Sequence, residues 1–395
     1  MKEKITMNEL FSGIGAQIEG INMTHLFDCE VKCTAEIEKD AMLSYAIMHC
    51  GLTQEYIKNQ MARKDIPFYK LAKFLTDRNI GFNFKTNKPY DWYKLIKNKK
   101  DELMKYYLAC KLSLNKGDIS KIKQLPYADL WTYSFPCQDI SVAGLQKGIK
   151  KGTRSGLLLQ VERLLKISKD NNTLPKYLLL ENVKNLVGQK HKKDFDIWIN
   201  ILNELGYNTY WKIINGRYNG IPQNRERVFA ISIRKNIDTR TFCFVNPYDS
   251  RLGLENILEN DVDKKYFCKK TKKSFIEHSI KGNTNKLVCE QRCDEGLRFF
   301  KGDYIGTLRT IDSCGDKRVI EYINGYPQIR KLTPKECWRF MGFKDEYIDK
   351  VIQFNIPQSK LYAQAGNSII TNCISNIIFS LYKAQYNKNF VIPRI

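Results

Sequence analysis

The feature of this sequence that most restricts its fold is an alternation, within residues 1–235, of short apolar runs and segments with helical spacing. The apolar runs, each about as long as a buried strand, lie at residues 5–11, 129–135, 176–183 and 227–233. Between them, residues 156–168 place Leu157, Val161, Leu164 and Leu165 on one helix face, and residues 194–206 end on a glycine, as helices often do. Strands that alternate with helices predict an α/β domain with a mostly parallel sheet.

The pattern changes after residue 235. Residues 236–332 are rich in Lys, Asn, Gly and scattered aromatics, with only short strand-like pieces, which predicts a smaller, irregular domain. Order returns at Thr333, which can cap a helix with Glu336 three residues later, and an amphipathic helix is expected from about Ile369 to Lys383. We therefore predict three parts, which are residues 1–235 with an insertion at about 50–112, residues 236–332, and residues 333–395 as a hinge and a helix that returns to the first domain.

The charge of the chain points to a polyanionic partner. Lys and Arg number 65 against 42 Asp and Glu, a formal net charge of +23, although a lysine-rich proteome would also raise this number. The sequence has no apolar run of about 18 residues and no apolar leader, so we expect a cytoplasmic protein with reduced thiols and no membrane contact. Its 12 cysteines form no C-x-x-C pair and only four histidines are present, so we expect no metal site.

A glycine turn follows the first apolar run, in the stretch "LFSGIG". Gly13 and Gly15 would let the backbone approach a ligand, and Glu36, 21 residues past Gly15, stands where an acid binds ribose hydroxyls. Ile18 replaces the third glycine of the dinucleotide fingerprint, which favours an adenosyl group without phosphates over a pyrophosphate. The alternative is a turn with a purely structural role.

Two reactive groups stand where other strands end. Cys137 lies in a polar turn beside Pro136, although most of the cysteines could be small apolar core residues. Glu181 and Asn182 end the run at 176–183, at the edge where open α/β sheets bind ligands, unless they merely cap a helix. Together they suggest a thiolate that adds to an electrophilic carbon while the acid protonates the far end of the π-system.

A pair of arginines precedes the run at 227–233. Arg225 and Arg227 are two residues apart at a predicted strand start, so we expect both to point to one side of the sheet. Such a pair suits a carbonyl or phosphate oxygen, and the alternative is a solvated charged edge.

The order of these pieces carries more information than any one of them. "LFSGIG", Glu36, "GDIS" at 117–120, "FPCQDIS", "ENV", "QNRERV" and "QAGNS" resemble, in that order, the motif series of the C5-cytosine DNA methyltransferases. The resemblance runs from residue 10 to residue 368 and is poor at 50–112 and 236–305. It implies a Rossmann-like S-adenosylmethionine-dependent methyltransferase sheet with helices on both faces, in a catalytic and cofactor-binding domain, with residues 236–332 as a target-recognition domain. The stretch from Glu36 to Asp118 is longer than the family generally needs. This extra segment, which includes residues 88–112, has the sequence of a lysine-rich helix, and it either contacts DNA or is a solvated insertion.

The resemblance also implies a role for individual residues. Cys137 would be the nucleophile, Glu181 would protonate cytosine N3, and Arg227 would hold the cytosine carbonyl oxygen with Arg225 in support. The residues implied around S-adenosylmethionine are Phe11, Ser12, Gly13, Gly15, Glu36, Ile37, Asp118, Ile119, Pro136, Leu157, Asn367 and Ser368. Those implied against the substrate are Gln138, Ser141, Asn182, Val183 and Thr307.

The implied activity is transfer of a methyl group from S-adenosylmethionine to C5 of a flipped-out cytosine, in a specific double-stranded DNA sequence, through a covalent Cys137–C6 intermediate. Such an enzyme would act as a monomer in a restriction-modification system, or as a phage or orphan enzyme, and any restriction endonuclease would not be needed for activity. A tRNA cytosine-5 methyltransferase is an alternative that the domain at 236–332 disfavours. A nicotinamide oxidoreductase would leave Cys137 and Glu181 unused, and a non-catalytic DNA-binding module would explain only the charge.

Overall fold

The structure is a computed structural model that describes residues 2–83, 86–135, 156–244, 252–268, 288–292, 296–300, 303–309 and 317–386. The chain divides into two compact units, which are taken in turn below. The first unit comprises residues 1–214, 227–245 and 377–395, and the second comprises residues 215–226 and 246–376. The assignment of catalytic, target-recognition and hinge roles to residues 1–235, 236–332 and 333–395 stays a prediction.

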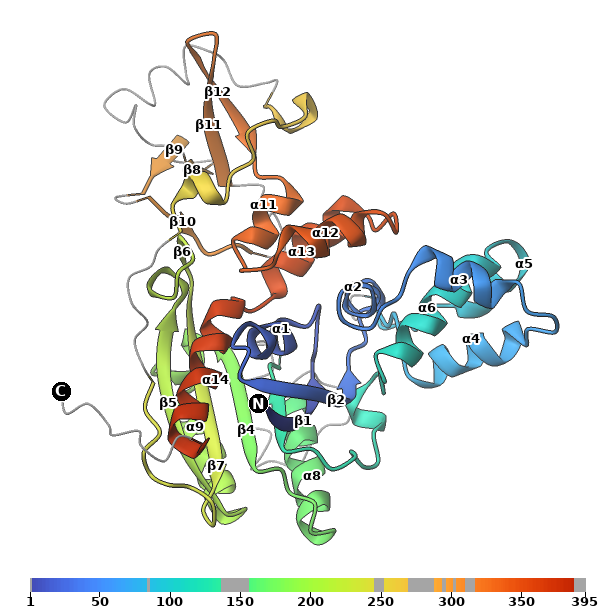
Figure 1. Ribbon diagram of the computed structural model, residues 1–395, viewed down its shortest axis with the longest axis vertical. Helices are drawn as coiled ribbons and strands as arrows, with labels where there is room; N and C mark the ends of the chain where they lie inside the picture. The colour runs from blue at the N-terminus through green and yellow to red at the C-terminus, as the bar shows by residue number, and fades with distance from the viewer. Residues whose placement is uncertain are drawn as a thin grey trace. The chain divides into compact units, whose positions relative to one another are not determined.

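The first unit is built on a six-stranded sheet with the strand order β2-β1-β3-β4-β7-β5 (Figure 1). Its strands are β1 (Glu3–Leu10), β2 (Phe27–Ala35), β3 (Leu130–Tyr133), β4 (Tyr177–Val183), β5 (Tyr207–Asn215) and β7 (Glu226–Arg234). β1 pairs in parallel with β2 and β3, β3 pairs in parallel with β4, and β7 runs antiparallel to β4. The predicted α/β fold is confirmed, and the antiparallel pair makes the sheet a mixed one.

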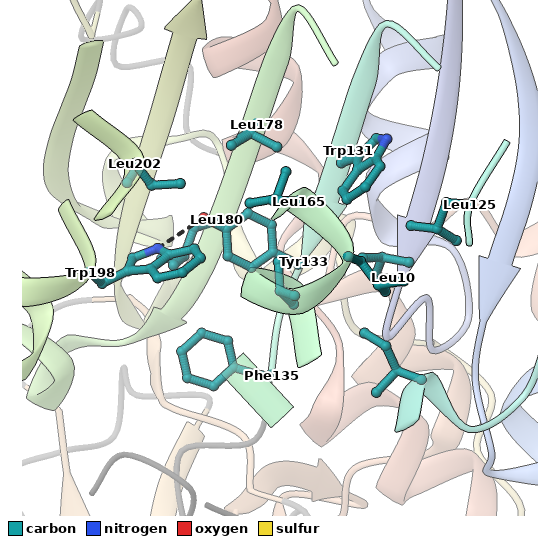
Figure 2. Packing of buried hydrophobic residues seen from close by; sticks show 14 of the residues in the cluster. Leu10, Leu125, Trp131, Tyr133, Phe135, Leu165, Leu178, Leu180, Trp198 and Leu202 are labelled. Atoms are coloured by element: carbon teal, nitrogen blue, oxygen red, sulfur yellow. Dashed lines mark hydrogen bonds between the residues drawn. The ribbon is translucent and has the colours of Figure 1, made fainter. Parts of the chain in front are cut away.

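An apolar core lies between this sheet and the helices α8 (Leu157–Asp170) and α9 (Lys192–Glu204). Trp131 and Tyr133 of β3 point into it, together with leucines of β4 and α8 (Figure 2). The indole nitrogen of Trp198 donates a hydrogen bond of 3.1 Å to the Tyr133 hydroxyl, whereas the buried indole nitrogen of Trp131 has no hydrogen-bond partner among the described residues. The core thereby fixes the end of β3, where the segment with Cys137 begins.

The opposite face of the sheet is covered by the end of α14 (Thr371–Tyr386). Side chains alternate along a strand, so Tyr177 faces away from the core that contains its neighbour Leu178. The Tyr177 hydroxyl contacts that of Tyr386 at 3.5 Å, and Phe27 of β2 packs edge-on against the Tyr386 ring. The expectation of helices on both faces is therefore confirmed.

The insertion is helical. After α1 (Ala16–Met23) and α2 (Lys39–His49), the chain forms α3 (Gln54–Met61), α4 (Phe68–Asp77), α5 (Leu95–Asn98) and α6 (Lys100–Leu112). These helices enclose Trp92, whose side chain is fully buried and donates a hydrogen bond to the carbonyl oxygen of Ile80. Tyr106 of α6 donates a hydrogen bond to Asp40 of α2, so the insertion is docked on the first unit through a buried polar contact.

The second unit holds a four-stranded sheet of order β12-β11-β8-β9 and a short two-stranded one. Its elements are β6 (Gln223–Asn224), β8 (Val288–Arg292), β9 (Gly296–Phe299), β10 (Ile305–Gly306), β11 (Lys317–Ile323), β12 (Tyr326–Lys331), α11 (Pro334–Arg339), α12 (Asp345–Ile352) and α13 (Gln358–Asn367). The predicted cap of α11 is confirmed, because Thr333 and Glu336 form a reciprocal capping box. In the part of the chain that the structure describes, no helix has the length and apolar character to cross a membrane.

Candidate active site

The loop after β1 has the backbone that its glycines allow. Phe11, Gly13 and Gly15 all have positive φ, at 58°, 53° and 86°. A Cβ on Gly15 would also lie 2.5 Å from Nε2 of His49, a ring that contacts the Ile14 carbonyl oxygen at 3.2 Å. Glycine is therefore required at position 15 for both its φ and its space. The Phe11 amide donates to the Ala35 carbonyl oxygen at 2.8 Å, so this glycine loop is tied to the end of β2.

Glu36 follows β2 directly and holds the glycine loop from the other side. One carboxylate oxygen accepts a hydrogen bond from the Gly13 amide at 2.9 Å, and the other accepts from the Glu38 amide at 2.7 Å. Burial raises the Glu36 pKa to about 7, although these two amides act in the opposite direction. A carboxylate has about four acceptor positions, so capacity remains for hydroxyl donors of a ligand.

Asn115 links Glu36 to the "GDIS" loop. Its side-chain oxygen accepts from the amides of Glu36 and Gly117 at 3.0 and 2.8 Å, and its amide nitrogen donates to the Glu36 carbonyl oxygen at 2.9 Å. Asn115 is 2% exposed, so these bonds are protected from water. The sequence analysis missed this residue, because its partner at position 36 is 79 residues away and no local pattern marks the contact.

Asp118, the second predicted acid, lies just beyond this link. One oxygen accepts from the Ser120 amide at 2.9 Å and caps a 3-10 turn at Ile119–Lys121, and the other accepts from the Asn79 side chain at 2.8 Å. The Ile119 side chain is buried. The structure thus brings the glycine loop, Glu36 and Asp118 to one edge of the sheet, at the carboxyl ends of β1 and β2.

The other predicted cofactor residues of the first unit lie around this edge. Phe11 and Leu157 are partly buried and both pack against the main core. Ile37 is also partly exposed, and its carbonyl oxygen accepts a hydrogen bond of 2.7 Å from the Gly81 amide of the insertion. The partly exposed side chains of Phe11, Ile37 and Leu157 are available for apolar contact with a ligand. The buried side chain of Ile119 instead supports the "GDIS" loop from the protein interior.

Glu181 and Arg227 form the most direct pairing of predicted catalytic residues. Glu181 lies opposite Phe229 and Val183 lies opposite Arg227 in the β4–β7 ladder, so Glu181 and Arg227 are diagonal neighbours on one face. The Arg227 Nε lies 3.3 Å from a Glu181 carboxylate oxygen. Their side chains are 16% and 11% exposed, which leaves this ion pair accessible to a ligand but poorly solvated.

The end of β3 is attached beside this ion pair. The buried side chain of Asn182 donates a hydrogen bond of 2.9 Å to the carbonyl oxygen of Phe135, and its own oxygen accepts from the Val183 amide at 2.9 Å. On the same strand end, Gln17 of α1 donates to the Ser134 hydroxyl at 3.2 Å. Pro136, Cys137, Gln138 and Ser141, which follow Phe135, lie outside the described residues.

The expectation that Arg225 and Arg227 share one side of a strand is wrong, because β7 begins at Glu226 and alternation does not extend to Arg225. Arg225 is 4% exposed, and its guanidinium donates to the carbonyl oxygens of Leu308, Gly366 and Ser368 at 2.9, 2.9 and 2.7 Å. These contacts lie in the second unit and connect segments distant in sequence. A catalytic role for Arg225 stays a prediction, and what the structure describes is a structural tie.

Thr307, Asn367 and Ser368 also belong to the second unit. The Thr307 hydroxyl donates to the Asn224 carbonyl oxygen at 2.8 Å, beside the short β6–β10 pairing. Asn367 ends α13 with an exposed side chain, and Ser368 is buried. Their predicted contacts with substrate and cofactor stay predictions.

No group of three or more potential metal ligands occurs among the described residues. The candidate site consists of two parts within the first unit. One is the glycine loop with Glu36, Asn115 and Asp118, and the other is the Glu181–Arg227 ion pair beside the end of β3.

Comparisons with known proteins agree on the family. A family model described as C-5 cytosine-specific DNA methylase matches residues 81–383. A type II methyltransferase, M2.ScrFI, of Lactococcus lactis subsp. cremoris is 36% identical over 95% of this chain and 99% of its own. An orphan methyltransferase, M.SssI, of Spiroplasma monobiae is 30% identical over 95% of this chain and 97% of its own.

Similarity in fold is also found with a protein of much lower sequence identity. The solved structure of a methyltransferase of Entamoeba histolytica has a TM-score of 0.58 at 15% identity and covers 96% of this chain and 98% of its own. That similarity supports the methyltransferase fold alone. The family model and the two relatives together show more, and the chain belongs to the C-5 cytosine-specific DNA methylases, enzymes that methylate cytosine in DNA.

Proposed function

We propose that this enzyme transfers a methyl group from S-adenosylmethionine to C5 of a cytosine flipped out of a specific double-stranded DNA sequence, with Cys137 as the nucleophile. The observation that carries the proposal is the Glu181–Arg227 ion pair, which lies on β4 and β7 next to the Asn182–Phe135 hydrogen bond. Cys137 follows Phe135 by two residues, so the acid, the cation and the start of the thiol segment belong to adjoining strand ends.

The proposed chemistry assigns a separate task to each residue. The thiolate of Cys137 forms a bond to C6 while Glu181 delivers a proton to N3, and the electron pair of the C5–C6 double bond moves toward C5. Arg227 leaves its contact with Glu181 to donate hydrogen bonds to the cytosine carbonyl oxygen. After C5 has been methylated, a base removes the C5 proton, the C5–C6 double bond reforms and the S–C6 bond breaks with the Cys137 thiolate as leaving group. The N3 proton returns to Glu181, which restores the neutral ring.

The residues at the carboxyl ends of β1 and β2 suit the methyl donor. S-adenosylmethionine, when bound, supplies an electrophilic methyl group on a sulfonium. Glu36 retains acceptor positions for the two ribose hydroxyls, and the glycine loop offers backbone without Cβ atoms at positions 13 and 15. Asn115 holds Glu36 and the loop that carries Asp118 at a fixed separation. The monomeric state, the intracellular location and any association with a restriction endonuclease are further expectations of the same proposal.

Trapping on a fluorinated substrate tests the nucleophile. Fluorine at C5 cannot leave as a cation, so DNA with 5-fluorocytosine at the target should stay joined to the enzyme through denaturation when S-adenosylmethionine is present. Peptide mapping should place the bond on Cys137. Cys137→Ser should form no adduct, because a hydroxyl is far less ionised than a thiol near neutral pH, and should still bind DNA. A tRNA substrate should be neither methylated nor trapped.

The covalent mechanism would be contradicted if the enzyme methylated ordinary DNA but formed no adduct with the fluorinated duplex. Trapping through another of the 12 cysteines would instead show that the nucleophile is misassigned.

A further inference from the structure

The insertion carries a surface that the methylation chemistry does not use. Along the line where α4 and α6 pack together, cations alternate with aromatic rings. We define the α4–α6 seam by Lys70, Phe74 and Arg78 of α4 and Lys100, Tyr107 and Lys111 of α6. Every charged side chain in this set is basic.

Aromatic rings contact three of the four cations of the seam. The Arg78 guanidinium carbon lies 3.5 Å from the centre of the Phe74 ring, and the Lys111 ammonium lies 5.8 Å from the same centre. Tyr107 packs against Phe74 with 5.2 Å between ring centres, and the Lys100 ammonium lies 5.0 Å from the Phe68 ring. Such contacts restrict the conformations of the side chains and so lower the entropic cost of ordering them when a ligand binds.

The charge of this surface is not balanced by the chain itself. Residues 51–112 contain 14 Lys and Arg against 6 Asp and Glu, so a net +8 of the total +23 lies in a sixth of the sequence. Lys70, Lys100 and Lys111 are exposed and form no ion pair with the described part of the chain, whereas Lys73 on the outer face of α4 pairs with Asp77. The apolar sides of the same helices are turned toward Trp92 and α2. The charged side chains that the seam exposes to solvent are therefore all positive.

The seam begins at the candidate cofactor site and leads away from it. The Arg78 carbonyl oxygen accepts from the Asp118 amide at 3.0 Å, and Lys121 donates to Asn79 at 2.8 Å. From there the 13 residues of α6 extend about 20 Å to Lys100. At about 3.4 Å per base pair, that length corresponds to about six base pairs of duplex.

We propose that the α4–α6 seam binds the sugar–phosphate backbone of duplex DNA outside the recognised sequence. The proposal rests on the proposed function, because it assumes that the partner is the DNA that the enzyme methylates. A row of cations on two helices, three of them in contact with aromatic rings, suits backbone contact rather than sequence readout. The seam would therefore add affinity on long DNA and leave the choice of target unchanged.

The test compares two triple variants of equal charge. Lys70→Gln, Lys100→Gln and Lys111→Gln neutralise the seam. The control is Lys2→Gln, Lys4→Gln and Lys235→Gln. These three exposed lysines lie at the opposite edge of the sheet, at the start of β1 and the end of β7, and the end of β7 pairs with the start of β4. Both variants remove three charges, so they change the long-range field of the protein equally. Their unfolding midpoints should match that of the parent enzyme.

Binding is measured as a function of salt on two duplexes with a central target, one of about 12 base pairs and one of about 40. On the long duplex the seam variant should bind about 10- to 100-fold more weakly, and its salt slope should fall by about two to three. On the short duplex, which ends about six base pairs from the target and so reaches no further than the distal lysines of the seam, its loss of affinity should be clearly smaller than on the long duplex. The control should lose little affinity on either duplex, and arginines at the three seam positions should restore long-duplex binding.

Equal losses by the two triple variants would overturn the proposal, because the effect would then be one of total charge. A seam variant that loses as much on the short duplex as on the long one, or that methylates a different sequence, would also overturn it. Failure of the parent enzyme to methylate either duplex would instead contradict the proposed function, so the two failures can be told apart.

Discussion

Glu36 combines two properties that have opposite effects on its ionisation. It already accepts two backbone hydrogen bonds, and burial nevertheless raises its pKa to about 7. Near neutral pH it is therefore close to half ionised. A ligand that donates hydroxyl groups to Glu36 favours the ionised form, so binding should release a proton at the acidic end of this range.

We expect the affinity for S-adenosylmethionine to rise about tenfold between about pH 6 and pH 8, as Glu36 loses its proton in the free enzyme. Glu36→Gln should bind more weakly and lose this part of the pH dependence, because its side chain does not titrate. Calorimetric titration in buffers of different ionisation enthalpy would measure both the affinity and the proton release. A parent enzyme and variant with parallel pH profiles would show that Glu36 does not contact the ribose.

Single residues also show which parts of the site a sequence can reveal. Gly13, Gly15 and Glu36 could be predicted, because the turn and the spacing to the second strand depend on local geometry. Asn115 could not, since its contacts depend on how the chain returns after the whole insertion. Arg225 was misplaced because strand alternation was extended one residue beyond the true start of β7.

Among the elements, α6 contributes to the buried interior of the first unit as well as to the proposed DNA-binding seam. Its Tyr106 is 3% exposed and donates a hydrogen bond to Asp40, which is 2% exposed, while Lys39 bridges both side chains at 2.8 Å. Removing a donor from a buried carboxylate is costly, because water cannot replace it. Excision of the insertion would remove this donor, so neutralising its surface is the better test of its function.

Tyr106→Phe should lower the free energy of unfolding by about 1–3 kcal/mol, because Asp40 loses a buried hydrogen bond while the ring remains. Tyr107→Phe is the matched control, since its half-buried hydroxyl forms no hydrogen bond with the described part of the chain and its ring packs against Phe74. Urea denaturation of both variants would measure the difference. If the two variants were equally stable, the contact between α6 and α2 would contribute nothing measurable.

The elements that could be predicted are those with a strong apolar pattern. β1, β3, β4 and β7, the helices α8 and α9, and the cap of α11 all lie close to their expected positions, because burial on the core imposes a regular spacing. β5 (Tyr207–Asn215) was not predicted, since most of its residues are only partly buried and its sequence mixes polar and apolar side chains. The helices of the insertion were expected only as lysine-rich helix, because their packing around Trp92 depends on contacts distant in sequence.

At the scale of the whole molecule, the residues of the proposed chemistry and those of the predicted target recognition fall in different units. The glycine loop, Glu36 and the Glu181–Arg227 ion pair belong to the first unit, and nearly all of residues 236–332 belong to the second. A reaction at C5 requires the same groups whatever the flanking sequence, whereas recognition requires side chains that differ with the target. This separation is the physical reason to expect specificity to be transferable.

A buried ion pair limits where such an exchange can be made. Arg330, which is fully buried, donates hydrogen bonds to both carboxylate oxygens of Glu336, at 2.9 and 2.7 Å. Residues 246–332 include Arg330 but leave Glu336 behind. A replacement segment without arginine at position 330 would leave an unpaired buried carboxylate, at a cost of about 3–5 kcal/mol.

We therefore predict that replacing residues 246–332 with the corresponding segment of a relative of different specificity, with Arg330 retained, transfers the methylated sequence to that of the donor. The same chimera with Arg330→Met should unfold at lower urea concentration, because Glu336 loses its buried partner. Sequencing the methylated cytosines in DNA from cells that express each chimera would identify the site. An exchange of residues 51–112, with Tyr106 retained, is the matched control and should leave the methylated sequence unchanged, since the α4–α6 seam is assigned to the DNA backbone. A chimera of residues 246–332 that is folded and active but still methylates the original sequence would place recognition outside this segment.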